Sequence, residues 1–188
     1  AYGVHVNVEL PNLKPETIGA YMRAYALLQW WLVDKHKIDI ARRISPYIDL
    51  YSTAYLKQIL SHPDADMDQI FDDYLEHNPS RNRGLDLLPL LATIDEKRVR
   101  GVIDDPRIKA RPAFHYRLPD CRIEHHDWSL QVPYDSWLVV EKLVERPQAI
   151  AELSAEFLSA ERQRPVLDIS RSDWVEFIDQ WLTDHALV

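Results

Sequence analysis

The chain has 188 residues, of which 46% are hydrophobic, so it is long enough to bury a substantial core within one domain. Its formal net charge of −8 argues against a protein that binds nucleic acid regardless of sequence, because such proteins need a basic surface. The single cysteine, Cys121, excludes a disulfide framework, and no apolar run is long enough for a membrane span or resembles a signal peptide. We therefore expect a cytoplasmic protein with no nucleic-acid or membrane partner.

The first predicted element is a β-strand over residues 2–10, where apolar and polar residues alternate. Its β-branched valines would all lie on one face, as strands favour. The other face would carry His5, Asn7 and Glu9. Such a set could bind a metal ion or hold a phosphate, although an edge strand with a solvated face has the same pattern.

Much of the remaining chain has the three- and four-residue apolar spacing of amphipathic helices. We expect helices at residues 15–35, 67–76, 133–146, 148–161 and from 170 onward, with helical pieces over 39–60. Pro15 suits the first position of a helix, and Asp66 is a suitable N-cap for the helix that follows it. Ser170 and Asp173 form a capping box at the start of the last helix.

Two arginines flank Asn82 just before an apolar segment that could be a helix or a strand. Guanidinium groups make bidentate contacts with carboxylates and phosphates, so Arg81 and Arg83 could bind an anion. Arginines near acidic surface are also common salt-bridge anchors. For the only basic doublet, Arg42-Arg43, we expect at least one side chain to lie in solvent.

A second strand is predicted at residues 113–118, between Pro112 and Pro119. One face is aromatic and aliphatic, whereas the other carries His115 and Arg117 side by side. This pattern fits a strand that faces a cleft, and a solvated strand surface would show it too. The chain has only four glycines and no glycine-rich phosphate loop, which excludes P-loop and Rossmann nucleotide sites.

Three of these segments occur in the order of known motifs: His5-Val6-Asn7, Arg81-Asn82-Arg83 and His115-Tyr116-Arg117-Leu118-Pro119-Asp120. They resemble motifs of the carboxylate–amine ligase superfamily, which has the glutamine synthetase fold. More narrowly, the segments RNRGLDLLPL and RPAFHYRLPD resemble the amidoligase family. The resemblance spans nearly the whole chain and corresponds to the C-terminal portion of the family's usual catalytic domain. It implies an α+β fold, an antiparallel sheet backed by helices, with residues 1–188 as a single domain.

The resemblance also implies a metal and nucleotide site. In glutamine synthetase-like enzymes a His-x-His motif supplies a metal ligand and a nucleotide contact; the matching positions are His5 and Asn7, where asparagine replaces the second histidine. A metal-binding glutamate of the last motif is replaced by His115, and imidazole favours softer metals than magnesium. The implied cofactors are ATP and magnesium or manganese. The glutamates that supply the other ligands lie on strands before these motifs and are not in this chain, so catalysis would need another polypeptide.

Arginines have separate roles in the same enzymes. Arg81 and Arg83 match residues that contact phosphates and the transferring phosphoryl group, and Arg117 matches the arginine that binds the substrate carboxylate. A further downstream arginine of those enzymes has no match here.

The implied function is ATP-dependent amide bond formation, in which a carboxylate becomes an acyl phosphate and an amine displaces phosphate. The expected partners are small-molecule or peptide carboxylate and amine substrates, and a homo-oligomer is left open. Two alternatives remain. One is a non-catalytic interaction module with an eroded ligase site, consistent with Asn7 and His115. The other is a metal-dependent hydrolase that uses His5 and His115. Convergence of Arg83, Arg117, His5 and His115 in one cleft would favour the ligase.

Overall fold

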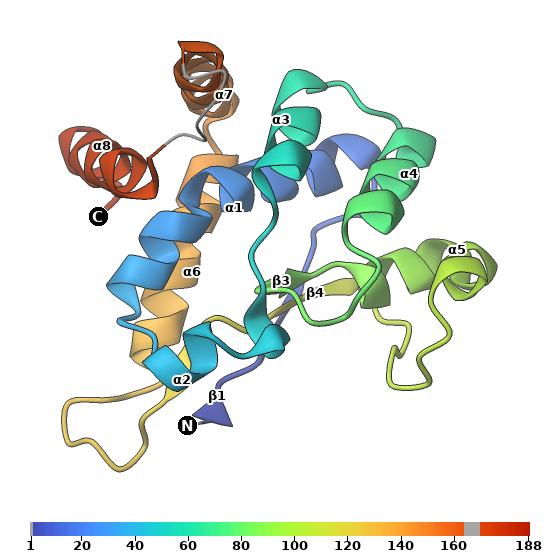
Figure 1. Ribbon diagram of the computed structural model, residues 1–188, viewed down its shortest axis with the longest axis horizontal. Coiled ribbons are helices and arrows are strands. Elements are labelled where there is room, and N and C mark those ends of the chain that lie inside the picture. Colours follow the sequence, from blue (N-terminus) through green and yellow to red (C-terminus); the bar gives the residue numbers. More distant parts are fainter. Residues whose placement is uncertain (1, 164–169) are drawn as a thin grey trace.

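The computed structural model describes residues 2–163 and 170–188 and has the expected α+β architecture (Figure 1). In chain order its elements are β1 (Tyr2–Gly3), β2 (Val6–Glu9), α1 (Pro15–Lys35), α2 (Ile40–Arg43), the 3-10 helix η1 (Pro46–Ile48), α3 (Thr53–Ser61), α4 (Met67–His77), β3 (Leu85–Asp86), α5 (Leu88–Val102), β4 (Ala113–Tyr116), β5 (Asp120–Cys121), α6 (Gln131–Val144), α7 (Pro147–Gln163) and α8 (Arg171–Asp184). None of the helices in the described ranges combines the length and the apolar character that a membrane crossing requires.

The strands form two small antiparallel sheets. One has the order β2-β4-β3, and its register places Asn7 and Asp86 on either side of His115. The other pairs β1 with β5. The single strand predicted over residues 2–10 is therefore divided into β1 and β2. The segment that pairs with it is likewise divided into β4 and β5, because Pro119 between them has no N–H to donate.

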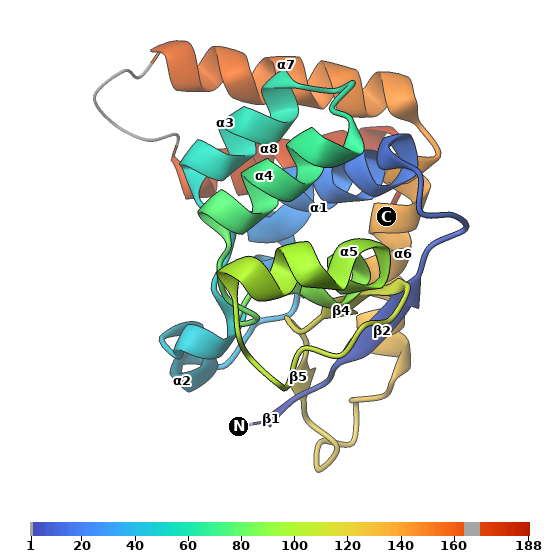
Figure 2. The ribbon, with the colours of Figure 1, turned by 90° about the vertical axis from the view of Figure 1, so that its right-hand side faces the viewer.

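Helix α1 forms the centre of the core, and every residue from 24 to 32 is buried. A helix that is apolar on all sides must be covered on all sides. Figure 2 shows α3, α4, α7 and α8 grouped around it, with the strands on the other side of the molecule. The apolar face of β4 packs on α1 through aromatic pairs, with ring centroids 5.8 Å apart for Tyr21 and Phe114 and 6.3 Å apart for Tyr25 and Tyr116.

The helix starts follow the predicted capping residues. Pro15 opens α1, and the Asp66 carboxylate accepts a hydrogen bond from the backbone N–H of Gln69 at 2.9 Å. Ser170 accepts one from the N–H of Asp173 at 3.4 Å. The three predicted helix starts are therefore confirmed. Each depends only on residues within one helical turn, so the local sequence determines it.

The end of β4 is held by Arg42. Its buried guanidinium donates to the carbonyl oxygens of Arg117 at 2.8 Å, Leu118 at 3.0 Å and Pro119 at 2.9 Å, and it pairs with the Asp120 carboxylate. The neighbouring Arg43 is exposed, as expected for one member of the doublet. Arg42 therefore fixes the backbone from which Arg117 projects.

Candidate functional site

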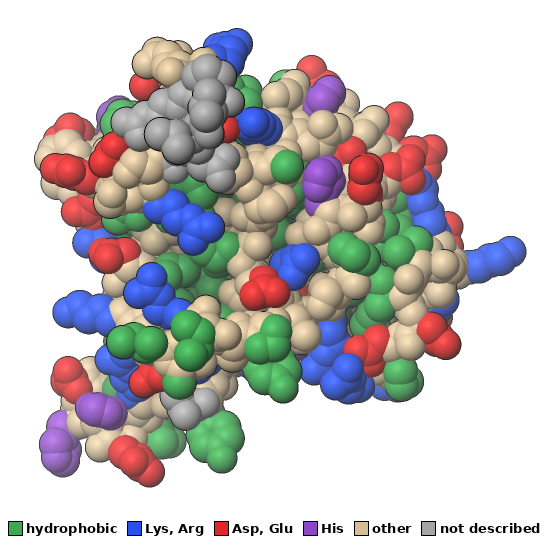
Figure 3. Space-filling model, viewed as in Figure 1, with side chains coloured by type: hydrophobic (Ala, Val, Ile, Leu, Met, Phe, Trp, Pro, Cys, Tyr) green, Lys and Arg blue, Asp and Glu red, His purple; other side chains and the backbone are tan. Residues whose placement is uncertain are grey.

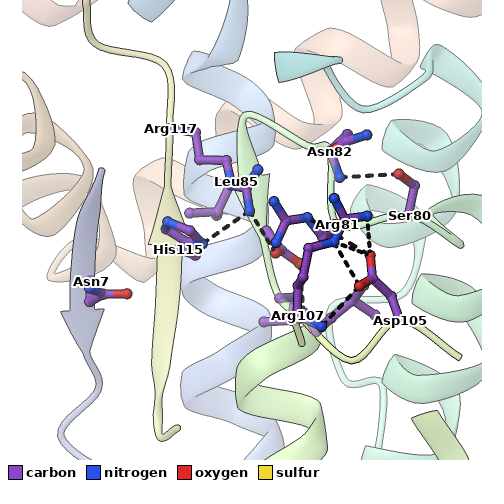
Figure 4. Close-up of polar contacts among 12 residues, drawn as sticks. Asn7, Ser80, Arg81, Asn82, Leu85, Asp105, Arg107, His115 and Arg117 are labelled. Atoms are coloured by element: carbon purple, nitrogen blue, oxygen red, sulfur yellow. Dashed lines mark hydrogen bonds and ion pairs between the residues drawn. The ribbon is translucent and has the colours of Figure 1, made fainter. Parts of the chain in front are cut away.

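The two faces of the β2-β4-β3 sheet differ in character. Tyr116 and its apolar neighbours face the helices, whereas period-two alternation turns His115 to the opposite face. On that polar face the side chains of Asn7, from β2, and His115, from β4, lie side by side (Figure 4). We call this the polar sheet face; its residues are His5, Asn7, Arg81, Asp86, Arg111, His115 and Arg117.

Two histidines meet on the polar sheet face. The rings of His5 and His115 are in edge-to-face contact, with centroids 4.9 Å apart. Burial, reinforced by the charge of Arg117, lowers the pKa of His5 and lowers the pKa of His115 to about 3. Both imidazoles are therefore neutral at pH 7, which is the form that binds metals.

Arg117 lies between His115 and a buried carboxylate. Its Nη2 lies 3.3 Å from Nδ1 of His115 and 3.7 Å from Oδ2 of Asp86. Because a guanidinium only donates, Nδ1 of His115 must be the acceptor and the ring proton must reside on Nε2. The Nε of Arg117 is buried and has no hydrogen-bond partner among the described residues, and burial lowers the pKa of this arginine.

Asp86 is a buried residue of the polar sheet face that the sequence did not single out as part of a site. It is 1% exposed, and burial raises its pKa to about 7, although it accepts a hydrogen bond from the N–H of Leu88 at 3.0 Å and faces Arg117. The sequence does contain one indication of a buried, paired carboxylate: Asp86 is the single acidic residue within the apolar run Leu85–Leu91. Carboxylates are rarely buried unless they are paired. The position of Asp86 beside Arg117 required the β3–β4 register.

Arg81 approaches the same face from the segment before β3. Its Nε lies 3.9 Å from Oδ2 of Asp105, whose carboxylate is bound by Arg107 at 2.8 Å (Figure 4). Hydrogen bonds from the side chain and the backbone N–H of Arg107 lower the pKa of Asp105 to about 2. The charge of Arg81 contributes to the lowered pKa values of both His5 and His115. Arg81 therefore adds positive charge to the polar sheet face.

Arg83 lies elsewhere. Its Nε donates to Oδ1 of Asn78 at 2.9 Å, its Nη1 lies 3.4 Å from Asp49, and its Nη2 contacts the carbonyl of His77 at 3.5 Å. The backbone of Arg83 forms a bridge with Asp49, which draws this part of the chain away from β2. Of the four residues expected to converge, the structure brings together His5, His115 and Arg117, whereas Arg83 makes no contact with them in the described ranges.

The predicted nucleotide contact, Asn7, is exposed and accepts a hydrogen bond from Nη1 of Arg111 at 2.7 Å. Arg111 thus becomes a third guanidinium on the polar sheet face, together with Arg81 and Arg117. Each is suited to carboxylate or phosphate oxygens, and a buried donor without a partner is costly unless a ligand satisfies it. The arrangement can bind an anion.

The polar sheet face is less suited to binding a metal ion than to binding an anion. Within residues 2–163 and 170–188, no three His, Cys, Asp or Glu side chains gather closely enough to hold a metal ion. Magnesium prefers an octahedral shell of oxygens, whereas His5 and His115 offer two nitrogens and Asp86 is committed to Arg117. The donor set of the described residues does not fit magnesium.

A family model described as a putative amidoligase enzyme matches residues 1–139. The matched range contains the whole polar sheet face and ends within α6. No curated protein and no solved structure matches the chain.

Proposed function

Because this chain belongs to the amidoligase family, we propose that its polar sheet face is part of the active site of an ATP-dependent ligase that joins a carboxylate to an amine. The observation that carries the proposal is the convergence of Arg81, Arg111 and Arg117 on one face, where the Nε atoms of Arg81 and Arg117 are buried and make no hydrogen bond among the described residues. Substrate carboxylates and phosphates would balance the positive charge of these three guanidinium groups.

In the proposed reaction, a carboxylate oxygen attacks the γ-phosphorus of ATP and ADP leaves. The amine nitrogen then attacks the carbonyl carbon of the acyl phosphate, inorganic phosphate leaves, and the nitrogen loses a proton. Negative charge is crowded at both steps, so fixed cations in a partly desolvated site stabilise the transition states. No step is assigned to a metal ion, because the donor set does not fit magnesium.

Each residue has a role that its surroundings support. Arg117 is proposed to bind the substrate carboxylate, and its guanidinium is oriented from one side by Nδ1 of His115 and from the other by Asp86. Arg81 is proposed to bind phosphate oxygens, because its Nε lies 3.9 Å from the Asp105 carboxylate, beyond hydrogen-bonding distance.

The test measures substrate binding rather than turnover, because the resemblance implies that further metal ligands come from another polypeptide. A panel of amino acids and dicarboxylates would be titrated calorimetrically into the parent chain and into Arg117→Ala. We expect at least one carboxylate to bind the parent and to bind Arg117→Ala at least tenfold more weakly. Undiminished binding in Arg117→Ala would contradict the assigned role. A metal-dependent hydrolase would instead bind zinc or manganese through His5 and His115 and show no affinity for ATP.

A further inference from the structure

We propose a second anion-binding site, separate from the polar sheet face, for a small organic anion that carries a carboxylate or phosphate group on an apolar body. The site is a hollow of about 450 Å³ between the end of α1, the α2–α3 connection and the start of α8. That volume is within the usual range for small-molecule sites. We call it the α8 hollow.

Three arginines from distant parts of the sequence line the α8 hollow: Arg43, Arg83 and Arg171. The Arg83 contacts with Asn78 and Asp49 aim it here rather than at the polar sheet face. Figure 3 shows the hollow on the face toward the viewer, with blue Lys and Arg side chains around a floor of hydrophobic ones. This second arginine of the Arg-Asn-Arg motif therefore has a setting that the proposed ligase chemistry does not use.

Two of these arginines lack acidic partners. Among the described residues, the guanidinium groups of Arg43 and Arg171 form no hydrogen bond and no ion pair; Arg171 lies over the Trp30 ring, 5.5 Å from its centroid. The lining contains one carboxylate, Asp49, which lies 3.4 Å from Arg83. Three positive charges against one negative charge leave the hollow with an excess of two, in a chain whose net charge is −8.

Acidic residues next to the hollow form no ion pair with these arginines. Asp34, Glu176 and Asp179 line an adjoining depression over α8 together with Arg43 and Arg171, and Asp179 already pairs with Lys35 at 2.8 Å. Neither Asp34 nor Glu176 forms an ion pair with Arg43 or Arg171 in the described part of the chain. The unpaired cations thus remain available to a ligand.

The apolar residues of the lining indicate that the part of the ligand beyond its charged group is apolar. Val33 and Leu50, both half-buried, provide apolar surface in the lining. Inorganic phosphate would satisfy the charges but leave this surface in water, whereas an anion with an apolar body would cover both. Guanidinium forks match carboxylate and phosphate equally well, so the experiment must distinguish the two.

The experiment is calorimetric titration with benzoate, phenyl phosphate, inorganic phosphate and the uncharged benzamide. We expect the stronger of benzoate and phenyl phosphate to identify the preferred head group, inorganic phosphate to bind at least tenfold more weakly, and benzamide not to bind. Arg43→Ala and Arg171→Ala should each weaken binding about tenfold, the loss expected for one charge-assisted hydrogen bond. Both side chains are exposed, so both variants should unfold at the temperature of the parent chain.

Two further variants separate the α8 hollow from other sources of positive charge. Lys97→Ala removes one exposed cation from α5 and should leave benzoate and phenyl phosphate affinities unchanged. Arg81→Ala removes a cation from the polar sheet face. Loss of binding in Arg81→Ala with retention in Arg43→Ala and Arg171→Ala would overturn the proposal, as would equal losses in Lys97→Ala or the absence of binding to both aromatic anions.

Discussion

The buried carboxylate of Asp86 should make the stability of the fold fall as the pH rises, and Asp86→Asn should abolish that fall. Burial raises the pKa of Asp86 from 3.8 to about 7, so the folded chain holds a proton that the unfolded chain has already released. The resulting stabilisation is fully present below about pH 4 and is lost as the pH rises through 7. Asparagine keeps the shape of the side chain but cannot titrate.

The size of the pH-dependent change in the free energy of unfolding follows from the pKa shift of Asp86. A change of about 3 pKa units at 1.36 kcal/mol each gives about 4 kcal/mol in total, of which about 2.5 kcal/mol falls between pH 5 and pH 8. The prediction concerns the change with pH rather than the absolute difference, because asparagine also removes the ion pair with Arg117. Relative to the parent chain, Asp86→Asn should therefore gain about 2.5 kcal/mol of stability over this range.

The assay is urea unfolding followed by tryptophan fluorescence at pH 5, 6, 7 and 8. Asp105→Asn is the matched control, because hydrogen bonds from Arg107 lower the pKa of Asp105 to about 2. The stabilisation from Asp105 is present above pH 4 and is lost only as the pH falls toward 2, so this variant should differ from the parent by a constant amount from pH 5 to pH 8. Parallel stability curves for the parent and Asp86→Asn would refute the reasoning.

Two other predictions concern the residues that hold the polar sheet face in place. Arg42→Ala should cost about 3–5 kcal/mol in urea unfolding, because it leaves the Asp120 carboxylate buried without its partner; Arg43→Ala should change stability by less than about 0.5 kcal/mol, and similar losses in both would contradict the assigned role. Gly84→Ala should cost about 1–3 kcal/mol by thermal unfolding, because the new Cβ would lie 2.5 Å from a tyrosine hydroxyl oxygen and 2.7 Å from a leucine methyl carbon. Gly101→Ala, with no neighbouring atom within 4 Å of the new Cβ in α5, should instead stabilise the chain by up to about 1 kcal/mol.

Local features of the fold could be predicted from the sequence. Helix α1 runs from Pro15 to Lys35 as its apolar spacing indicated, and Asp66 and Ser170 cap the helices that they precede. These features depend on side chains within a few residues of one another, so the sequence carries their full cause. The polar face on which His115, in β4, and Arg117, just after it, lie together was predictable for the same reason, although β4 ends at Tyr116 rather than at residue 118.

Features set by distant segments could not be predicted. The two arginines of the Arg-Asn-Arg motif look equivalent in the sequence, but Asp49 and Asn78 draw Arg83 away, and only Arg81 reaches the polar sheet face. Asp86 reads as one acidic residue in an apolar run until the strand register places it beside His115. The positions of Arg83 and Asp86 both depend on contacts with residues far away in the sequence, and local residue spacing does not identify those residues.

The measurement that tests the central claim most directly is calorimetric titration of ATP, with magnesium and with manganese, into the parent chain, Arg81→Ala, Arg83→Ala and Lys97→Ala. If the polar sheet face is a ligase site, the parent should bind ATP, Arg81→Ala should bind it at least tenfold more weakly, and Lys97→Ala should match the parent. Undiminished ATP binding in Arg81→Ala, together with its loss in Arg83→Ala, would contradict the account by placing the nucleotide in the α8 hollow instead.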